Sequence, residues 1–319
     1  MSMNCRFCDN TVTKITSFGK MPIANAFLNE DQFKDEYFFE LAPTYCPNCS
    51  LFQLLHQPDP ALLFHENYAF FANTSDYMQS HFKNLSNKLI DNFELWKKDL
   101  VVEIGNNDGG MVRYLNDNNY NCIGVDPSKN VSDYAKSLGV NMINRFFNYE
   151  LSNEILDKYG KVKFFLSANT LAHIPDINSV FRGVSNLLDE DGIYVTEDPY
   201  LIDVFDKVSY DQIYDEHVFI FSLTSISNIC AKYDLEVFDI EKLNTAGGSL
   251  RYYIAKKNKK NKSSRVVEQE LIESKYKLYD DKVYLDFKNH CENSKRDLYD
   301  NLVNLSQNSK VVSYGATSK

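Results

Sequence analysis

The order of apolar and amphipathic segments between residues 100 and 256 is the feature that most constrains how this chain can fold. Short apolar runs typical of buried strands alternate with stretches whose apolar residues recur at helical spacing. Strands are expected over 100–105, 121–126, 141–146, 162–168 and 192–197, and helices over 109–117, 128–138, 150–158, 178–188 and 223–233. This alternation predicts a parallel sheet with helices on both faces, and a ligand site beyond the carboxyl ends of its strands.

The last two apolar runs of this region, 235–243 and 249–256, break the alternation. Only residues 244–248 join them, which is too short for the crossover that a parallel pair needs, so we expect an antiparallel hairpin. Five parallel strands followed by such a hairpin resemble the Rossmann-like, seven-stranded α/β sheet of class I methyltransferases. The predicted fold is therefore of this type.

A glycine-rich turn follows the first of these strands. Gly105 and Gly109 are four residues apart, Glu103 precedes the first glycine by two, and Asp126 ends the next expected strand. Glycines let the backbone approach a nucleotide, and an acid at the end of the second strand can accept hydrogen bonds from ribose hydroxyls. A dinucleotide site has the pattern G-x-G-x-x-G, so the glutamate-x-glycine form favours S-adenosylmethionine over NAD. The alternative is that this turn is only a loop.

Further residues follow the other strands at the same rim of the expected sheet. The predicted cofactor-binding residues are Glu103, Gly105, Asn107, Gly109, Asp126, Phe147 and Asn169. Asp126 can instead be an acid at the N-terminus of the next helix, because Pro127 and Ser128 follow it. Phe147 and its neighbour Phe146 can flank an adenine or pack in the core.

Two C-x-x-C pairs near the N-terminus predict a metal site. Cys5, Cys8, Cys46 and Cys49 supply four thiolates, which suits a closed, tetrahedral and therefore structural zinc site. The 37 residues between the pairs exceed the usual spacing of a zinc ribbon, so a redox C-x-x-C is the alternative. The total of seven cysteines is odd, which argues against a disulfide framework. A region this small has little core, so zinc is expected to supply much of its folding free energy.

Composition limits the partners of this chain. Its net charge of −10 argues against a nucleic acid or an anionic membrane as the main partner. We find no apolar run long enough to span a bilayer and no signal-peptide pattern at the start, so a cytoplasmic protein with a small substrate is expected.

A long segment, 198–221, separates the fifth strand from the next helix at the predicted ligand rim. Such connections often carry substrate specificity. Tyr214, Glu216 and His217 place a phenol, a carboxylate and an imidazole within four residues, and His173 comes from the neighbouring turn. These groups can supply general acid and base chemistry, although a loop histidine can also be a solvated surface residue.

Several motifs occur in one order along the whole chain. They are the paired cysteines, Met21-Pro22-Ile23-Ala24-Asn25, Glu103-Ile104-Gly105-x-Asn107-Asp108-Gly109, Ala172-His173-Ile174-Pro175-Asp176, Tyr214-x-Glu216-His217 and Gly247-Gly248-Ser249-Leu250-Arg251. In these motifs the chain resembles the sugar C-methyltransferases that act on nucleotide-linked 4-keto-hexoses, the family of the tetronitrose and noviose C-methylating enzymes. The resemblance implies a structural zinc domain, a central S-adenosylmethionine domain and a C-terminal Rossmann-like domain that helps to hold the nucleotide sugar.

The resemblance also implies roles for the residues of the long segment. His217 would remove the proton alpha to the ketone, with Tyr214, Glu216 and His173 around the keto sugar. A carbon beside a ketone becomes nucleophilic only after deprotonation, and the enolate oxygen then needs a hydrogen-bond donor. Tyr200, Ser249 and Arg251 are the predicted substrate-binding residues. Oxygen or nitrogen methylation of a sugar or another small metabolite, and a non-catalytic cofactor-binding protein, are the alternatives.

The expected domain organisation has five parts. They are a zinc-binding domain over 1–60, a helical connector over 61–97, a methyltransferase domain over 98–257 with the insertion 198–221, a helical linker over 258–309, and the start of a C-terminal Rossmann-like domain over 310–319. Because one strand cannot form a sheet, the chain is expected to be truncated, to be part of a split gene product, or to use a C-terminal domain from a partner chain.

Overall fold

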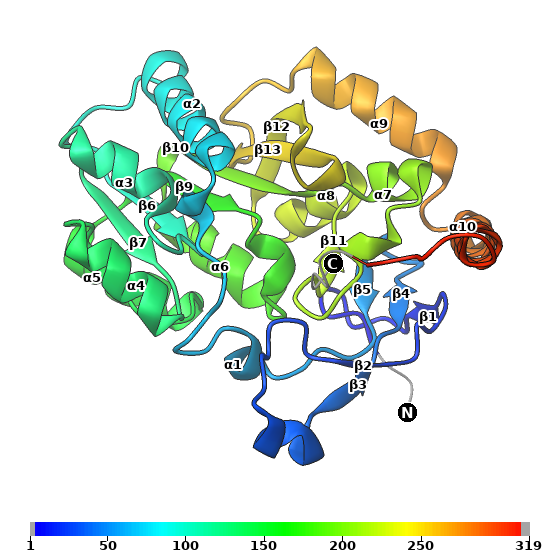
Figure 1. Cartoon of the computed structure of the whole chain (residues 1–319). Coiled ribbons are helices and arrows are strands. Elements are labelled where there is room, and N and C mark those ends of the chain that lie inside the picture. The colour runs from blue at the N-terminus through cyan, green and yellow to red at the C-terminus, as the bar shows by residue number, and fades with distance from the viewer. Residues whose placement is uncertain (1–3, 314–319) are drawn as a thin grey trace.

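A seven-stranded sheet runs through the middle of the computed structural model, which describes residues 4–313 (Figure 1). Its strands are β6 (Val101–Ile104), β7 (Cys122–Val125), β8 (Met142–Ile143), β9 (Val162–Ala168), β10 (Leu188–Pro199), β12 (Leu235–Leu243) and β13 (Ser249–Lys256). Their order across the sheet is β12-β13-β10-β9-β6-β7-β8. The strands from β6 to β10 are parallel to one another, whereas β13 is antiparallel to both β10 and β12. The predicted hairpin and the class I methyltransferase sheet are confirmed.

Helices cover both faces of this sheet, as predicted (Figure 1). They are α2 (Asp76–Asn92), α3 (Gly110–Asp117), α4 (Lys129–Ser137), α5 (Tyr149–Tyr159), α6 (Ile177–Leu187) and α8 (Leu223–Lys232). Alternate strand residues point to opposite faces. Val102 and Phe165 join one buried cluster with α5, α6 and α8, while Val101 and Phe164 join a second cluster with α2 and α3. The apolar periodicity therefore identified both layers.

Some element boundaries differ from those expected. β8 has two residues instead of six, because only Met142 and Ile143 of this edge strand pair with β7. β10 begins at Leu188, four residues earlier than expected, and pairs there with Val162. The polar C-terminal region forms two helices, α9 (Ser264–Tyr276) and α10 (Asp281–Ser306), since Lys277 takes a left-handed conformation with φ of 51°.

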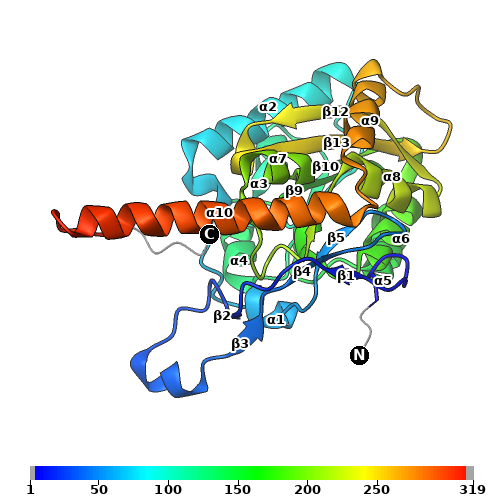
Figure 2. The same ribbon diagram turned by 90° about the vertical axis from the view of Figure 1, so that its right-hand side faces the viewer.

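The helix α10 extends away from the body of the molecule (Figure 2). Residues 310–313, after α10, form neither helix nor strand. The predicted start of a further domain over 310–319 otherwise lies outside the described residues. Within residues 4–313, no helix combines the length and the apolar character that crossing a membrane requires.

The N-terminal region forms a second, smaller sheet. It contains β1 (Thr13–Lys14), β4 (Pro43–Tyr45), β5 (Phe52–Leu54) and β11 (Phe219–Ile220), in the order β1-β4-β5-β11. Nearby are the two-stranded sheet of β2 (Lys20–Pro22) and β3 (Phe38–Glu40), the short helix α1 (Pro60–Leu63) and the 3-10 turns η1 (Glu30–Asp35) and η2 (Ala72–Thr74). The fourth strand, β11, comes from the insertion 198–221 rather than from the N-terminal region.

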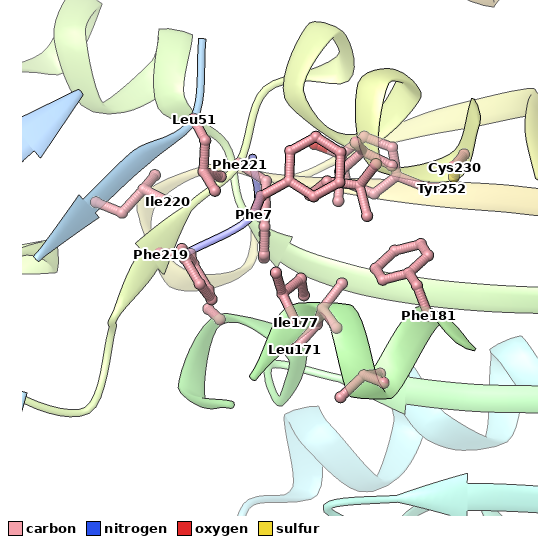
Figure 3. Close-up of a cluster of buried hydrophobic side chains, with 14 of the residues drawn as sticks. Phe7, Leu51, Leu171, Ile177, Phe181, Phe219, Ile220, Phe221, Cys230 and Tyr252 are labelled. Atoms are coloured by element: carbon pink, nitrogen blue, oxygen red, sulfur yellow. The ribbon is translucent and has the colours of Figure 1, made fainter. Parts of the chain in front are cut away.

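The insertion is itself folded. It contains α7 (Leu201–Lys207) and the 3-10 turn η4 (Tyr210–Gln212) before β11, and the 3-10 turn η5 (Thr245–Gly247) of the β12–β13 hairpin lies beside the end of β10. Figure 3 shows Phe7 and Leu51 of the N-terminal region near Phe219 and Phe221 of the insertion. All four belong to one buried cluster that continues into the central sheet. The zinc-binding domain predicted over 1–60 thus shares its sheet and its core with the predicted domain over 98–257.

Candidate functional site

A cavity lies at the carboxyl ends of β6, β7 and β9, where the topology of the sheet predicts a ligand site. Its volume is about 710 Å³, which is enough for a cofactor and a small substrate. Loops after these strands form one wall. The N-terminal region, the segment before α2 and the insertion form the others.

The glycine turn is held by the carboxyl group of Glu103. Its two oxygens accept hydrogen bonds from the backbone N–H groups of Met111 (3.2 Å) and Val112 (2.9 Å) at the start of α3. Burial raises the pKa of Glu103 to about 8. Gly105 has φ of 61°, and a Cβ there would lie 2.2 Å from the side chain of Thr170, so only glycine fits this close approach.

Asp126 at the end of β7 points into the cavity and fixes two turns. One of its oxygens accepts from the N–H of Asn107 (2.9 Å) and the other from the N–H of Ser128 (2.8 Å), the N-cap of α4. Its carboxylate therefore interacts with a helix N-terminus, as the alternative interpretation expected, and still lines the cavity. Burial raises its pKa to about 6.

Of the remaining predicted cofactor residues, some line the cavity and others do not. Asn107 and Asn169 line the cavity, whereas Gly109 does not and acts as the N-cap of α3. Phe147 reaches the cavity but is 95% buried, with its ring centroid 5.0 Å from that of Phe165, so it also packs in the core. Phe146, which lines the same wall, is 43% exposed.

Sequence reasoning missed the part that residues 70–73 play in this wall. The side chain of Asn107 donates to the carbonyl of Phe70 (3.0 Å) and accepts from the N–H of Ala72 (3.0 Å), and the N–H of Asn73 donates to Asp108 (3.1 Å). The connector thus closes over the glycine turn. The aromatic residues of this segment, 68–73, follow neither a helical nor a strand period, so its sequence carried no signal for such contacts.

The four predicted catalytic side chains meet on the opposite wall. The ring of His217 lies 4.4 Å from that of Tyr214 and 5.1 Å from that of His173, measured between centroids. Nδ1 of His217 lies 2.8 Å from the carbonyl oxygen of Gln212, and Nε2 lies 3.4 Å from the hydroxyl of Tyr214. Because a carbonyl only accepts, Nδ1 carries a proton, and in the neutral ring Nε2 is then the basic nitrogen.

Glu216 connects this cluster to the N-terminal region. Its oxygens accept from the side-chain amide of Asn25 (2.5 Å) and from the hydroxyl of Tyr68 (3.1 Å), and one lies 4.0 Å from Nδ1 of His173. Burial first, and then the charge of Glu216, raise the pKa of Tyr68 well above its ordinary value, so its hydroxyl stays a donor. Asn25 and Tyr68 line the cavity, and sequence reasoning did not single out either as a site residue.

The three predicted substrate residues lie outside the cavity lining. The hydroxyl of Tyr200 donates to Glu273 (2.8 Å) and that of Ser249 to the carbonyl of Thr245 (3.0 Å). Arg251 donates to the buried Glu197 (2.5 Å) and to the partly buried Glu241 (2.7 Å). All three are at least nine-tenths buried, and their polar groups bind other parts of the protein. Their neighbours Thr245 and Ala246 reach the cavity instead.

The four N-terminal cysteines come together as predicted. The ligand atoms of Cys5, Cys8, Cys46 and Cys49 lie within 4.8 Å of one another, and three of the sulfur pairs are 3.5–3.6 Å apart. A tetrahedral zinc with Zn–S bonds of about 2.3 Å requires sulfur atoms about 3.8 Å apart, whereas a disulfide requires about 2.05 Å. The geometry fits the metal and not a disulfide.

Comparisons with known proteins agree with this arrangement. A family model described as a putative zinc binding domain matches residues 5–64, a methyltransferase domain model matches 77–240, and a C-methyltransferase C-terminal domain model matches 244–319. The C-methyltransferase NovU of Streptomyces niveus is 32% identical over 253 residues, which are 79% of this chain. The chain spans about 60% of the length of that curated relative.

Two solved structures are also similar. Magnesium protoporphyrin IX methyltransferase from Synechocystis, crystallised with bound SAH, is 12% identical, with a TM-score of 0.44, and the match covers 56% of this chain and 83% of that one. The PH0226 protein from Pyrococcus horikoshii is 17% identical, with a TM-score of 0.45, and the match covers 59% of this chain and 95% of that one.

The methyltransferase domain model matches residues 77–240, which are more than half of the 319 residues of this chain. The chain therefore belongs to the methyltransferase family.

Proposed function

We propose that this protein is an S-adenosylmethionine-dependent C-methyltransferase that methylates the carbon alpha to the ketone of a nucleotide-linked 4-keto-deoxyhexose. The observation that carries the proposal is the orientation of His217. Its Nδ1 proton is held by the carbonyl of Gln212, so the basic Nε2 is beside Tyr214 on the cavity wall. The similarity to NovU, a C-methyltransferase, supports the same chemistry.

In the proposed reaction, Nε2 of His217 takes the proton from the carbon beside the ketone, and the electron pair of that C–H bond moves toward the carbonyl oxygen. Tyr214 or His173 donates a hydrogen bond to the oxyanion. Glu216, held by Asn25 and Tyr68, interacts with a sugar hydroxyl or amine. When bound, S-adenosylmethionine would supply the methyl group for the nucleophilic carbon, with S-adenosylhomocysteine as the other product. The turns around Glu103 and Asp126 would hold it.

The charged residues that line the cavity indicate which part of a nucleotide sugar would bind inside it. Among the described residues that line the cavity there is no lysine or arginine, whereas Asp59, Glu103, Asp126, Asp176 and Glu216 are acidic. A diphosphate needs cations or N–H donors. We therefore place only the sugar in the cavity and the nucleotide diphosphate outside it, where a partner chain or a further domain can hold it.

The same observation favours a second candidate, methylation of oxygen or nitrogen on a small, uncharged metabolite. Proton exchange separates the two. The protein is incubated in deuterated water with S-adenosylhomocysteine and a nucleotide-linked 4-keto-6-deoxyhexose, and the sugar is examined by NMR. We expect deuterium at the carbon alpha to the ketone. No deuterium, together with a methyl group on a heteroatom when S-adenosylmethionine is supplied, would contradict C-methylation.

We also propose that Cys5, Cys8, Cys46 and Cys49 hold one structural zinc ion. Four thiolates leave no open position, so the ion would stabilise the N-terminal region and take no part in methyl transfer. Metal analysis of the purified chain is expected to give one zinc per chain, and Cys46→Ser is expected to remove most of it.

A further inference from the structure

The segment that carries the predicted catalytic residues continues directly into the N-terminal sheet. Tyr214, Glu216 and His217 precede β11, whose Phe219 pairs with Gln53 and whose Ile220 pairs with Phe52 of β5. The N–H of Leu54 also donates to the carbonyl of Val218 (2.8 Å). The backbone next to His217 is therefore fixed by β5.

A second set of contacts holds the residues before His217. The N–H of Ala24 donates to the carboxyl group of Asp215 (2.9 Å), and the side chain of Asn25 donates to Glu216 (2.5 Å). Asp215 is 2% exposed and does not line the cavity. It faces the N-terminal region, whereas its neighbours Tyr214 and Glu216 face the substrate side.

The cysteine cluster is built into the same sheet. Cys46 follows β4 directly, Cys49 lies three residues before β5, and the N–H of Cys46 donates to the carbonyl of Leu51 (3.0 Å). The second cysteine pair is thus the turn between β4 and β5. A metal ion there closes the turn that positions β5, and β5 in turn pairs with β11.

Packing joins these parts into one unit. Phe7, which lies between Cys5 and Cys8, belongs with Leu51 and Phe219 to the buried cluster of Figure 3. The central domain also binds the cysteine turns, since the side chain of Asn228 donates to the carbonyl of Cys49 (3.1 Å). A change in the conformation of the cysteine turns would therefore be transmitted to His217 through β5, β11 and the packing of these buried side chains.

We propose that the N-terminal cysteine region is a scaffold for the catalytic segment, and that Asp215 is a positioning residue that fixes His217 through its bond to Ala24. The chemical role of that segment rests on the proposed function, but its dependence on the scaffold does not. The zinc-bound region thus acts on the substrate half of the cavity and leaves the cofactor half unchanged.

Hydrogen exchange of the full chain, with and without a zinc chelator, tests the scaffold. Removing the metal is expected to speed exchange in 213–221 by about tenfold and in 101–104 and 162–168 by less than about twofold. Titration of S-adenosylhomocysteine is expected to give an unchanged affinity. Unchanged exchange in 213–221, or an equal increase in the central strands, would overturn the proposal.

Variants of Asp215 test the positioning role, with Asp211→Ala as the matched control. Asp211 is an exposed aspartate of the same segment and makes no contact with the N-terminal region in the described contacts. Asp215→Ala is expected to slow deuterium incorporation about tenfold with unchanged cofactor affinity, because it removes the acceptor for Ala24. Asp215→Asn keeps an acceptor oxygen and should restore most of the rate.

Amide exchange and deuterium incorporation into the sugar test the scaffold and the proposed function separately. If the unchanged protein exchanges no proton on the keto sugar, the proposed function fails, and the exchange of amides in 213–221 still judges the scaffold. If Asp215→Ala behaves like Asp211→Ala in both amide exchange and proton exchange, Asp215 is not a positioning residue.

Discussion

The two walls of the cavity are built in different ways. The wall proposed to hold the cofactor, the cofactor wall, consists of turns that follow parallel strands, and its carboxylates Glu103 and Asp126 bind backbone N–H groups within 20 residues of themselves in the sequence. The wall proposed to hold the substrate, the substrate wall, brings together Asn25, Tyr68 and Glu216, of which the first and last are 191 residues apart. In a wall made of local turns, the position of each side chain depends on the strand that precedes it. In a wall made of distant segments, it depends on how the domains pack together. Variants of the cofactor wall should therefore change the affinity for S-adenosylhomocysteine, and variants of the substrate wall should change the rate of proton exchange on the keto sugar.

The largest effect is expected from His217→Asn on the substrate wall. Asparagine keeps much of the polar contact but has no basic nitrogen. Deuterium incorporation into the keto sugar is expected to fall by about 10³-fold, within the range for loss of a general base. Calorimetric affinity for S-adenosylhomocysteine should stay nearly unchanged. A loss of affinity equal to the loss of rate would show that the two walls are not separate.

Asp126→Asn on the cofactor wall should give the reverse pattern. Losing a charged acceptor is expected to weaken S-adenosylhomocysteine binding about tenfold. Burial raises the pKa of Asp126 to about 6, so its carboxylate is charged above that pH and protonated below it. Affinity of the unchanged protein should therefore fall as pH is lowered through about 6. An equally steep fall in the asparagine variant would assign the pH dependence to another group.

Glu103 makes a prediction about stability. Its pKa rises from the ordinary value of 4.5 to about 8 in the folded protein, so between these values the folded state binds more protons than the unfolded state. The contribution of this group to stability is then greatest below about pH 4.5 and is lost as pH rises through about 8. Urea unfolding at pH 6 and at pH 9, about two units below and one unit above the pKa of Glu103 in the folded protein, should show this loss. The variant Glu103→Gln should lack it.

The smallest effect is expected at the two neighbouring phenylalanines. Phe146→Ala removes an exposed ring from the cofactor wall and should weaken S-adenosylhomocysteine binding about fivefold with little change in stability. Phe147→Ala removes a buried ring and should destabilise the fold by about 3 kcal/mol. Thermal unfolding together with calorimetry distinguishes the two. If both variants lose only stability, neither ring contacts the cofactor.

Much of the cofactor wall could be predicted from the sequence, because its residues follow strands that the apolar pattern identifies. Glu103, Gly105, Asn107 and Asp126 all line the cavity. The exceptions have local causes. Gly109 is the N-cap of α3 and does not line the cavity, and Phe147 packs in the core as well as lining the cavity. The apolar periodicity of the sequence cannot tell these two positions from residues that only line the cavity.

The substrate wall was predicted only in part. The short motif around Tyr214, Glu216 and His217 was visible because its residues are neighbours in the chain. Tyr68 and Asn25 were not singled out as site residues, since nothing in their surroundings indicates a partner 148 or 191 residues away. Arg251, in contrast, was predicted to bind substrate, but it pairs with the carboxylates of Glu197 and Glu241.

Local patterns along the chain were enough to predict the seven-stranded sheet, its hairpin, the four-cysteine cluster and the rim of the sheet at which the cavity lies. These follow from local periodicity and spacing, which a single chain displays directly. The folded structure was needed to show that the insertion supplies β11 to the N-terminal sheet and that Ala24 and Asn25 hold the acids beside His217. Strand pairing between distant segments is fixed by burial of a shared core, and no local pattern records which segments will share it.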